Sequence, residues 1–274
     1  MTLRQKINVI AKILTRVVYN PKLLFEVLKD ETVFEKYLQK KYRKTLLPTV
    51  DLREFLEEDS GKIEHFTFLD GSSLVTDLVL LRSLAKSIPD CDYLEIGMWR
   101  GESVMNVAQE AKTCTTVNLS AEEIVKMKLP EKYAKLHGCL INNQDNIKIV
   151  YANSMTFDFS SLNQKYDLIF VDGDHHYEAV KSDTQKVFPL LKDDNSIIVW
   201  HDYAYNPEKP RHSVIAGILD GLPPTAHQYL YHVSNTISAI YTKRKIKSDL
   251  TLIEPPVTPD KIFRVEISAK SLKK

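Results

Sequence analysis

The chain has 274 residues, enough for one large α/β domain plus extensions or for two small domains. Its residues are 43% hydrophobic and 27% charged, a composition typical of a soluble protein. The net charge of +1 argues against nucleic acid as a partner. The three cysteines, Cys91, Cys114 and Cys139, show no CxxC spacing, so we expect neither a disulfide framework nor a structural zinc site and predict a cytoplasmic location.

Residues 1–70 are predicted to form a basic helical extension. Residues 1–50 contain 11 Lys+Arg and 4 Asp+Glu, a net charge of +7. Apolar residues at alternating spacings of four and three predict an amphipathic helix over residues 2–18, followed by helices from Asn20 to Leu28 and from Glu31 to Tyr42. We expect the apolar sides to pack on the main domain. A homodimer contact and a peripheral membrane contact through the basic face are the open alternatives.

Residues 71–245 alternate between helical and strand patterns. The predicted elements are a helix over Leu74–Ile88, a strand over Asp92–Gly97, a helix over Glu102–Ala111, and strands over Cys114–Leu119 and Lys148–Ala152. A helix over Ser213–Leu219 and strands over Tyr229–Val233 and Ile237–Thr242 follow later. This alternation predicts an α/β fold with a doubly wound, mostly parallel, seven-stranded sheet and an antiparallel pair at one edge. Residues 246–274 are predicted to form a C-terminal extension with a final strand over Phe263–Ile267.

The stretch from Tyr166 to Tyr203 contains two apolar runs, Leu168–Val171 and Ile197–Trp200, each of which ends abruptly in polar residues. Between them lies a segment with apolar residues on one helical face, so the stretch is a βαβ unit with parallel strands. Both polar clusters then lie at the carboxyl ends of strands, where open α/β sheets bind their ligands. We therefore expect six residues to converge there: Asp172, Asp174, His175, His176, His201 and Asp202.

A second motif lies at the end of the strand over Asp92–Gly97. Glu95, Gly97 and Gly101 have the form acidic-x-Gly-x-x-x-Gly at a strand-to-helix turn, where glycine permits positive φ and a close approach of the backbone to a ligand. Any glycine turn in a βα unit looks similar, so the motif alone is weak. The spacing differs from the GxGxxG of dinucleotide-binding folds, and the next strand ends in Asn118 instead of an acid.

The two motifs YLEIGMWRGES and DLIFVDGDHHYEAVKSDTQKVFPLLKDDNSIIVWHDY together resemble the class I S-adenosylmethionine-dependent methyltransferases, over roughly Leu74 to Thr242. More narrowly, they are similar to small-molecule O-methyltransferases of the macrolide-sugar type. The resemblance implies a Rossmann-like fold, with Glu95, Gly97 and Gly101 around the methionine part of the cofactor and Asp172 beside its reactive end. It also implies that Asn118 contacts the ribose, where the family has an acid, and that Asn153 and Ser154 contact the adenine.

Several carboxylates in one cleft repel each other, at roughly 3 kcal/mol for each pair about 5 Å apart at an effective dielectric near 20. A bound cation or a protonated histidine would remove this cost. Magnesium prefers carboxylates, waters and substrate oxygens, whereas His201 would also suit manganese, iron or zinc. By the resemblance, Asp172, His201 and Asp202 are the predicted metal ligands and His175 matches the basic position, although family members more often have an acid at position 201.

Together with these residues, the resemblance implies methyl transfer to a hydroxyl of a small molecule, for example a sugar, with assistance from a metal such as Mg²⁺ and with His175 as general base. His176 is the alternative base. Asp174 could instead cap a helix beside an exposed His175, and His201 could merely orient Asp202. Tyr203, Tyr205 and Arg211 form either the acceptor wall or an ordinary connector. The rival functions are a non-catalytic binding or assembly module and a metal-dependent hydroxylase or hydrolase on a similar sheet.

Overall fold

The computed structural model describes residues 2–19, 31–130, 132–141, 144–247, 251 and 257–272, so the predicted helix from Asn20 to Leu28 lies outside the described residues. The α-helices are α1 (Leu3–Tyr19), α3 (Glu31–Tyr42), α4 (Val75–Lys86), α5 (Glu102–Val107), α6 (Ala121–Lys126), α7 (Lys132–Leu136), α8 (Tyr177–Val187) and α9 (His212–Gly221). Short 3-10 helices are η1 (Leu52–Phe55), η2 (Phe159–Leu162), η3 (Phe188–Leu190) and η4 (Pro224–Tyr229). None of the helices in this part of the chain has the length and hydropathy that crossing a bilayer requires.

The strands are β1 (Thr49–Val50), β2 (Asp92–Ile96), β3 (Thr113–Asn118), β4 (Ile147–Tyr151), β5 (Leu168–Val171), β6 (Ile197–Trp200), β7 (Ala204–Asn206), β8 (Lys209–Pro210), β9 (Leu230–Val233) and β10 (Ala239–Tyr241). Strands β7 and β8 pair with each other, and the others form one sheet in the order β1-β9-β10-β6-β5-β2-β3-β4. Only β10 runs antiparallel to its neighbours in this sheet. The predicted doubly wound, mostly parallel sheet is confirmed.

The number of strands in the sheet differs from the prediction. The described sheet has eight strands instead of seven, because Thr49 and Val50 pair in parallel with His232 and Val233 of β9. A strand of two residues is too short to produce an alternating pattern in the sequence. Its burial nevertheless ties residues before the main domain into the sheet, since Val50 is fully buried.

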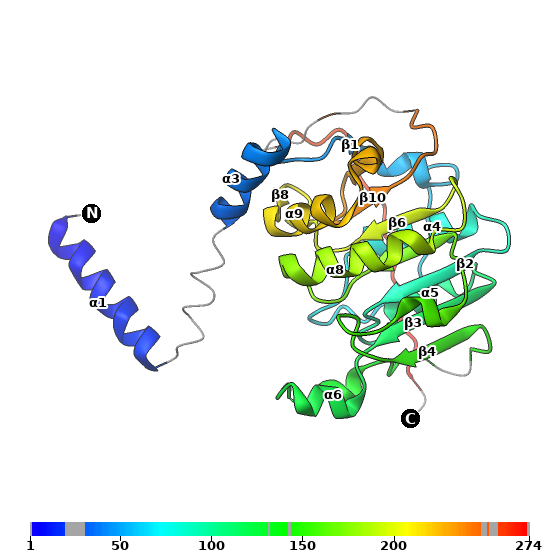
Figure 1. Ribbon diagram of the computed structural model, residues 1–274, viewed down its shortest axis with the longest axis horizontal. Helices are drawn as coiled ribbons and strands as arrows, with labels where there is room; N and C mark the ends of the chain where they lie inside the picture. Colours follow the sequence, from blue (N-terminus) through cyan, green and yellow to red (C-terminus); the bar gives the residue numbers. More distant parts are fainter. Residues whose placement is uncertain are drawn as a thin grey trace.

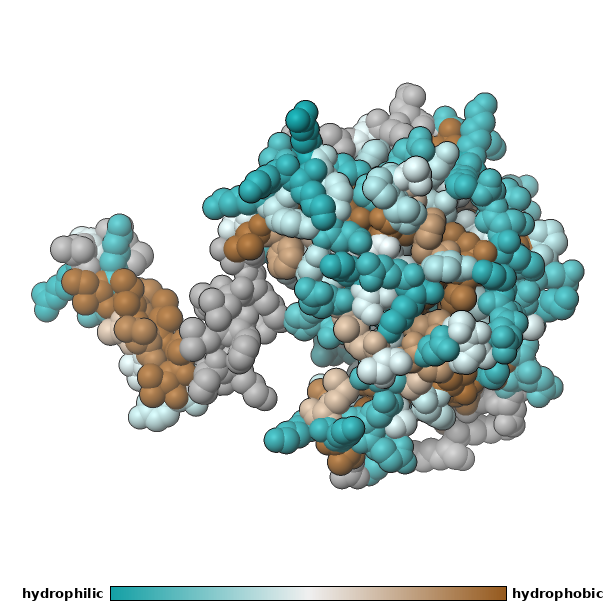
Figure 2. Space-filling view, in the orientation of Figure 1, coloured by the Kyte–Doolittle hydropathy of each residue, from teal (hydrophilic) through white to brown (hydrophobic). Residues whose placement is uncertain are grey.

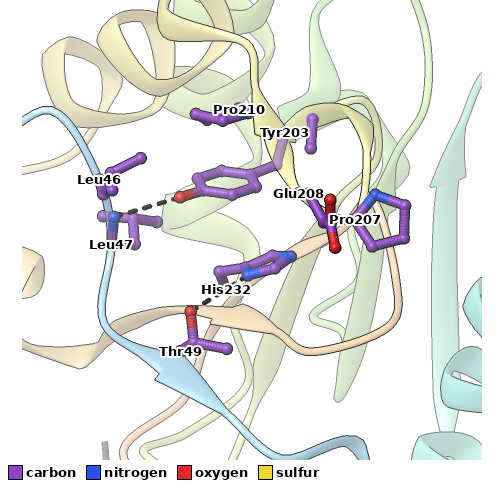
Figure 3. A pocket seen from close by; sticks show the side chains of 9 residues that line it. Leu46, Leu47, Thr49, Tyr203, Pro207, Glu208, Pro210 and His232 are labelled. Atoms are coloured by element: carbon purple, nitrogen blue, oxygen red, sulfur yellow. Dashed lines mark hydrogen bonds between the residues drawn. The ribbon is translucent and has the colours of Figure 1, made fainter. Parts of the chain in front are cut away.

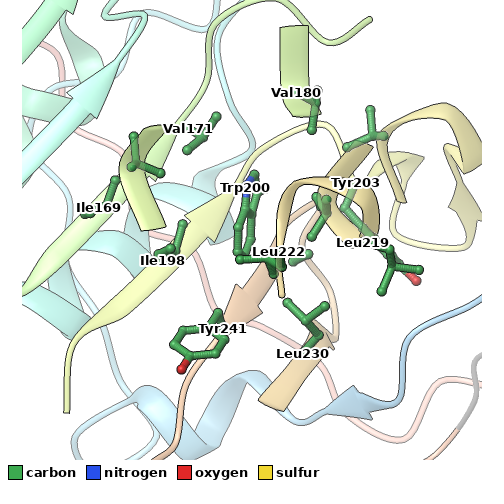
Figure 4. Close-up of a cluster of buried hydrophobic side chains, with 14 of the residues drawn as sticks. Ile169, Val171, Val180, Ile198, Trp200, Tyr203, Leu219, Leu222, Leu230 and Tyr241 are labelled. Atoms are coloured by element: carbon green, nitrogen blue, oxygen red, sulfur yellow. The ribbon is translucent and has the colours of Figure 1, made fainter. Parts of the chain in front are cut away.

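The sheet has helices on both faces, and its strand residues divide between two hydrophobic clusters. In β5, Ile169 and Val171 join the cluster beneath α8 and α9, whereas Leu168 and Phe170 join the cluster beneath α4 and α5. Figure 4 shows part of the first cluster, with Trp200 at its centre. Because these strands are buried on both faces, they read as continuous apolar runs. In Figure 1, α8 and α9 lie side by side on one face of the sheet.

Helix α3 of the N-terminal extension packs against α9, as predicted. Asp220 at the end of α9 accepts hydrogen bonds from the hydroxyls of Tyr37, Tyr42 and Tyr177 and from Lys41 Nζ. We call these five residues the Asp220 cluster. Its acceptor is nearly buried, with 4% of the Asp220 side chain exposed. The cluster fixes α3 to α8 and α9.

The same prediction is wrong for α1. Figure 1 shows this helix set apart from the body of the protein, and the apolar side chains of Ile7, Ile10 and Leu14 are between 56% and 59% exposed. The periodic pattern identified the helix correctly, but a pattern of this kind does not specify which surface covers the apolar face.

The predicted final strand over Phe263–Ile267 is also wrong. Residues 257–272 contain neither helix nor strand, and Val265 and Ile267 are 60% and 72% exposed. Apolar residues alternate there as in a strand, but a strand forms only where a neighbouring backbone supplies hydrogen bonds. The division of the chain at residues 70 and 245 stays a prediction.

Candidate functional site

The chain reverses its direction of travel across the sheet between β2 and β5. From β2 it continues outward through β3 and β4, then returns to β5 on the other side of β2 and continues through β6. Ligands of open α/β sheets bind at such a switch point, outside the carboxyl ends of the strands. The predicted site residues follow β2, β3, β4, β5 or β6, except Glu95, which lies within β2, and Asn118, which is the last residue of β3. The topology therefore gathers them along one edge.

Gly97 allows the β2–α5 turn to press against the end of β5. Its φ is +86°, and a Cβ atom there would lie 2.2 Å from the carbonyl oxygen of Asp172. No other residue fits without moving one of the two loops. Gly101 also has positive φ, +94°, directly before α5. The close approach at Gly97 and the positive φ at both positions give both glycines a structural reason to be present, separate from any ligand.

Glu95 lies within the protein, beneath this turn. It is fully buried, and its carboxylate accepts hydrogen bonds from the Tyr93 hydroxyl at 2.6 Å and the Ser103 hydroxyl at 2.8 Å. Burial raises the pKa of Glu95 to about 8, although the two hydroxyls oppose the rise. The carboxyl group thus supports the turn from below, and a contact with the cofactor stays a prediction.

The predicted ribose and adenine residues lie at the ends of β3 and β4. Asn118 is 6% exposed, and its amide bonds Met98 N and His137 Nδ1. Asn153 and Ser154 are partly accessible, and the Asn153 side chain accepts from Met155 N in the turn after β4. Amide and hydroxyl groups at this edge suit the hydroxyls and ring nitrogens of a nucleoside. The donor set therefore fits S-adenosylmethionine, with Asn118 the most constrained member.

The predicted metal ligands converge. Asp172, His201 and Asp202 each offer a ligand atom, and these atoms all lie within 4.8 Å of one another. His201 Nδ1 is 2.9 Å from Asp172 Oδ1 and 3.5 Å from Asp202 Oδ2. We call these three residues the strand-end triad, since they follow β5 and β6. They line a pocket together with Val171, Gly173, Asp174, His175, Val180 and Trp200.

Two further residues lie next to the triad, and the sequence did not predict that they would contact it. Asp77, in the first turn of α4, is fully buried and its Oδ2 lies 3.6 Å from His201 Nε2. Arg211, predicted as acceptor wall or connector, places Nη1 3.3 Å from Asp202 Oδ1. The signal for Asp77 was an acid in the otherwise apolar buried face of a predicted helix.

The surroundings of the triad favour a positively charged His201 and a negatively charged Asp202. Burial disfavours a charged imidazole, but the charges of Asp172, Asp202 and Asp77 outweigh it and raise the pKa of His201 well above its usual value. Burial likewise opposes ionisation of Asp202, yet His201 and Arg211 lower the pKa of Asp202 to about 2. Without a bound ion, His201 is therefore the cation that relieves the repulsion between the carboxylates.

His175 lies at the rim of the same pocket. Its Nδ1 is 3.7 Å from Asp202 Oδ2, and its side chain is 45% exposed. Burial lowers the pKa of His175, although Asp202 opposes the shift, so the imidazole is neutral at pH 7. The alternative in which Asp174 caps α8 is wrong, because His176 is the N-cap and has no side-chain cap bond; the Asp174 carboxylate accepts instead from His176 N at 2.9 Å. His176 also bonds Asp174 through its ring.

Tyr203 and Tyr205 do not line the strand-end pocket. Tyr203 is buried, accepts a hydrogen bond from Leu47 N and stacks on His232, with ring centroids 4.9 Å apart (Figure 3). Figure 3 shows a separate pocket, which forms where residues before β1 meet the loop after β6. Tyr205 bonds Glu31. Burial lowers the pKa of His232 to about 4, as expected for a structural histidine.

The strand-end triad fits a divalent cation. Neither ring nitrogen of His201 has a hydrogen bond of ordinary geometry within the described residues, although carboxylates face both. Asp77 faces the nitrogen opposite the triad, where metal-ligating histidines commonly meet a carboxylate. A metal binds imidazole only in its neutral form, so it would have to displace a proton from His201.

Residues 94–203 match the family described as a methyltransferase domain. Among curated proteins, none matches the chain. An O-methyltransferase from Bacillus cereus in complex with SAH is 14% identical with a TM-score of 0.47, covering 64% of this chain and 84% of that one. A protein assigned as a caffeoyl-CoA O-methyltransferase from Staphylococcus aureus is 20% identical with a TM-score of 0.45, covering 70% and 90%.

The family match spans both motifs of the candidate site, from β2 to the residue after Asp202. The doubly wound, mostly parallel sheet and the polar residues at the ends of its strands agree with the arrangement that the sequence predicted. Residues 94–203 are thus a methyltransferase domain.

Proposed function

We propose that the enzyme transfers a methyl group from S-adenosylmethionine to a hydroxyl oxygen of a small polar acceptor, for example a sugar. The observation that carries the proposal is the approach of a neutral histidine, His175, to the strand-end triad in one pocket. The carboxylates, imidazoles and guanidinium around this pocket favour an acceptor with several hydroxyls over an apolar one.

His175 is the proposed general base. When bound, S-adenosylmethionine supplies an electrophilic methyl group on a positively charged sulfur, and the carbon–sulfur bond breaks as the acceptor oxygen bonds to the methyl carbon. The acceptor proton passes to His175, whose positive charge Asp202 then stabilises from 3.7 Å. Arg211 contacts the other oxygen of Asp202 and keeps that carboxylate directed into the site.

A divalent cation such as Mg²⁺ is the proposed assistant. Asp172, Asp202 and the neutral form of His201 would hold it, and it would lower the pKa of the acceptor hydroxyl. Asp77 would orient the His201 ring from the opposite nitrogen. Because the cation competes with a proton on His201, its apparent affinity should increase with pH.

The test is transfer of a labelled methyl group from S-adenosylmethionine to a panel of hydroxyl compounds that includes sugars. His175→Gln should lower turnover by about 10²–10⁴-fold while cofactor affinity, measured by calorimetry, stays unchanged. His65→Gln is the matched control, because His65 bonds Gln109, away from the pocket.

Three outcomes would contradict parts of the proposal. Full turnover in His175→Gln with loss in His176→Gln would move the base to the neighbouring histidine. Activity unchanged after chelation would exclude a catalytic cation. A methyl group recovered on nitrogen or carbon, instead of oxygen, would overturn the acceptor class.

A further inference from the structure

Helix α1 combines an exposed apolar face with a purely basic set of charges. Its 17 residues include Arg4, Lys6, Lys12 and Arg16 and no acidic residue. Figure 2 shows an apolar band along the helix, with hydrophilic residues at its margins. The formal charge of α1 is +4, so the rest of the chain carries −3 of the total of +1.

The apolar face is broad. Ile7, Ile10 and Leu14 form its centre, and Ile13 and Val18 widen it on either side at 100° per residue. These five side chains are between 50% and 76% exposed. Lys12 and Arg16 fall on the opposite side of the helix. Arg4 lies at the edge of the apolar face and Lys6 lies within it, where its long side chain can extend the ammonium group to the headgroups. A helix with a broad apolar face and only basic charges is suited to the plane of a membrane interface.

A homodimer through α1 is the weaker explanation of this face. The four-three spacing extends over about two heptads, whereas a coiled coil needs at least three or four. Two copies would also bring eight positive charges together with no acidic residue in α1 to pair with them. A coiled-coil seam is narrow, and it would leave Ile13 and Val18 uncovered.

We propose that α1 binds the surface of a bilayer that contains anionic lipids, with its apolar face in the interface and its cations at the headgroups. The helix lies on the membrane and does not cross it, since no described helix is apolar enough to span a bilayer. The net negative charge of the rest of the chain disfavours contact through the body, so α1 supplies the contact.

Flotation of the full-length protein with lipid vesicles tests the proposal. Vesicles of phosphatidylcholine with about one third phosphatidylserine should bind it well, and pure phosphatidylcholine vesicles much less. Lys12→Gln with Arg16→Gln should weaken binding by about 25-fold, on the basis of about five-fold for each lost charge. Ile10→Ser with Leu14→Ser should abolish it.

Lys126→Gln with Lys148→Gln is the matched control, because both lysines are exposed, lie outside α1 and give the same change in charge. This control should bind as the wild type does. Thermal unfolding of the α1 variants should match the wild type, since the substituted side chains are solvent-exposed or half-exposed.

Equal binding to both kinds of vesicle, or equal loss in the control variant, would overturn the proposal. So would a dimer in light scattering that Ile10→Ser with Leu14→Ser dissociates, if no vesicle binding accompanies it. Methyl transfer is measured separately, so failure of lipid binding leaves the proposed function untouched.

Discussion

Asp183 of α8 is a buried carboxyl group whose ionisation should destabilise the fold. It is fully buried, and neither carboxyl oxygen has a hydrogen bond within the described residues. It lies beneath the turn after β5, where a Cβ atom on Gly173 would be 3.4 Å from Asp183 Oδ2. Burial raises the pKa of Asp183 from 3.8 to about 6, although neighbouring polar groups oppose the shift.

The direction of the pH effect follows from the raised pKa. Below pH 3.8 the carboxyl group is protonated in both states, so the stability is fully present. As the pH rises, the unfolded chain ionises first, and the free energy of unfolding falls until the folded group also ionises near pH 6. At 1.36 kcal/mol for each pH unit, the total loss is about 3 kcal/mol.

Asp183→Asn removes this dependence, because an amide does not ionise. We expect the stability of the variant relative to wild type to increase by about 3 kcal/mol from low to high pH, mostly between about pH 4 and pH 6. Any difference in hydrogen bonding of the buried amide shifts the stability difference by a constant and leaves its slope with pH unchanged. Urea unfolding followed by tryptophan fluorescence at several pH values measures it.

Asp145→Asn provides the control, because Asp145 is exposed and the substitution makes the same chemical change. Its stability relative to wild type should be nearly independent of pH. A constant difference for Asp183→Asn across the range, or one that shrinks with rising pH, would refute the argument from burial.

Two further substitutions, each with a control, test contacts that hold the fold together. Asp220→Ala leaves three tyrosine hydroxyls and Lys41 without this acceptor. We expect the free energy of unfolding in urea to fall by about 2–4 kcal/mol, with faster hydrogen exchange in α3. Asp194→Ala is the control, because it breaks an exposed pair with Lys243 and should cost less than about 1 kcal/mol. Gly97→Ala should cost about 3 kcal/mol or more, because its Cβ would lie 2.2 Å from a carbonyl oxygen at positive φ, whereas Gly173→Ala, with 3.3 Å to its nearest neighbour, should cost far less. Equal losses for the two members of either pair would contradict the contacts on which these expectations rest.

The sequence was sufficient for the elements that carry the site. The strands Leu168–Val171 and Ile197–Trp200 match their predicted bounds, since a strand buried on both faces is a continuous apolar run that polar residues end sharply. Their parallel pairing then follows from the crossover rule, and so does the meeting of Asp172 with His201.

The remaining features depend on contacts between distant parts of the chain. Asp77 meets His201 across more than a hundred positions, so no local pattern connects the two. Glu95 differs, because its partners Tyr93 and Ser103 are only two and eight positions away, yet the motif alone did not indicate that the carboxyl group is buried. Residues 263–267 have a strand pattern and no strand, because pairing needs a partner that a pattern cannot supply.

The pairing of β1 with β9 has a consequence for shortened versions of the enzyme. An uncovered strand at the edge of a sheet offers free N–H and C=O groups to other molecules and promotes aggregation. Thr49 and Val50 occupy that edge, and Thr49 also forms a bridge with Thr251. A chain trimmed to begin at residue 71 would uncover the backbone of His232 and Val233, whereas one that begins before residue 45 would keep it protected.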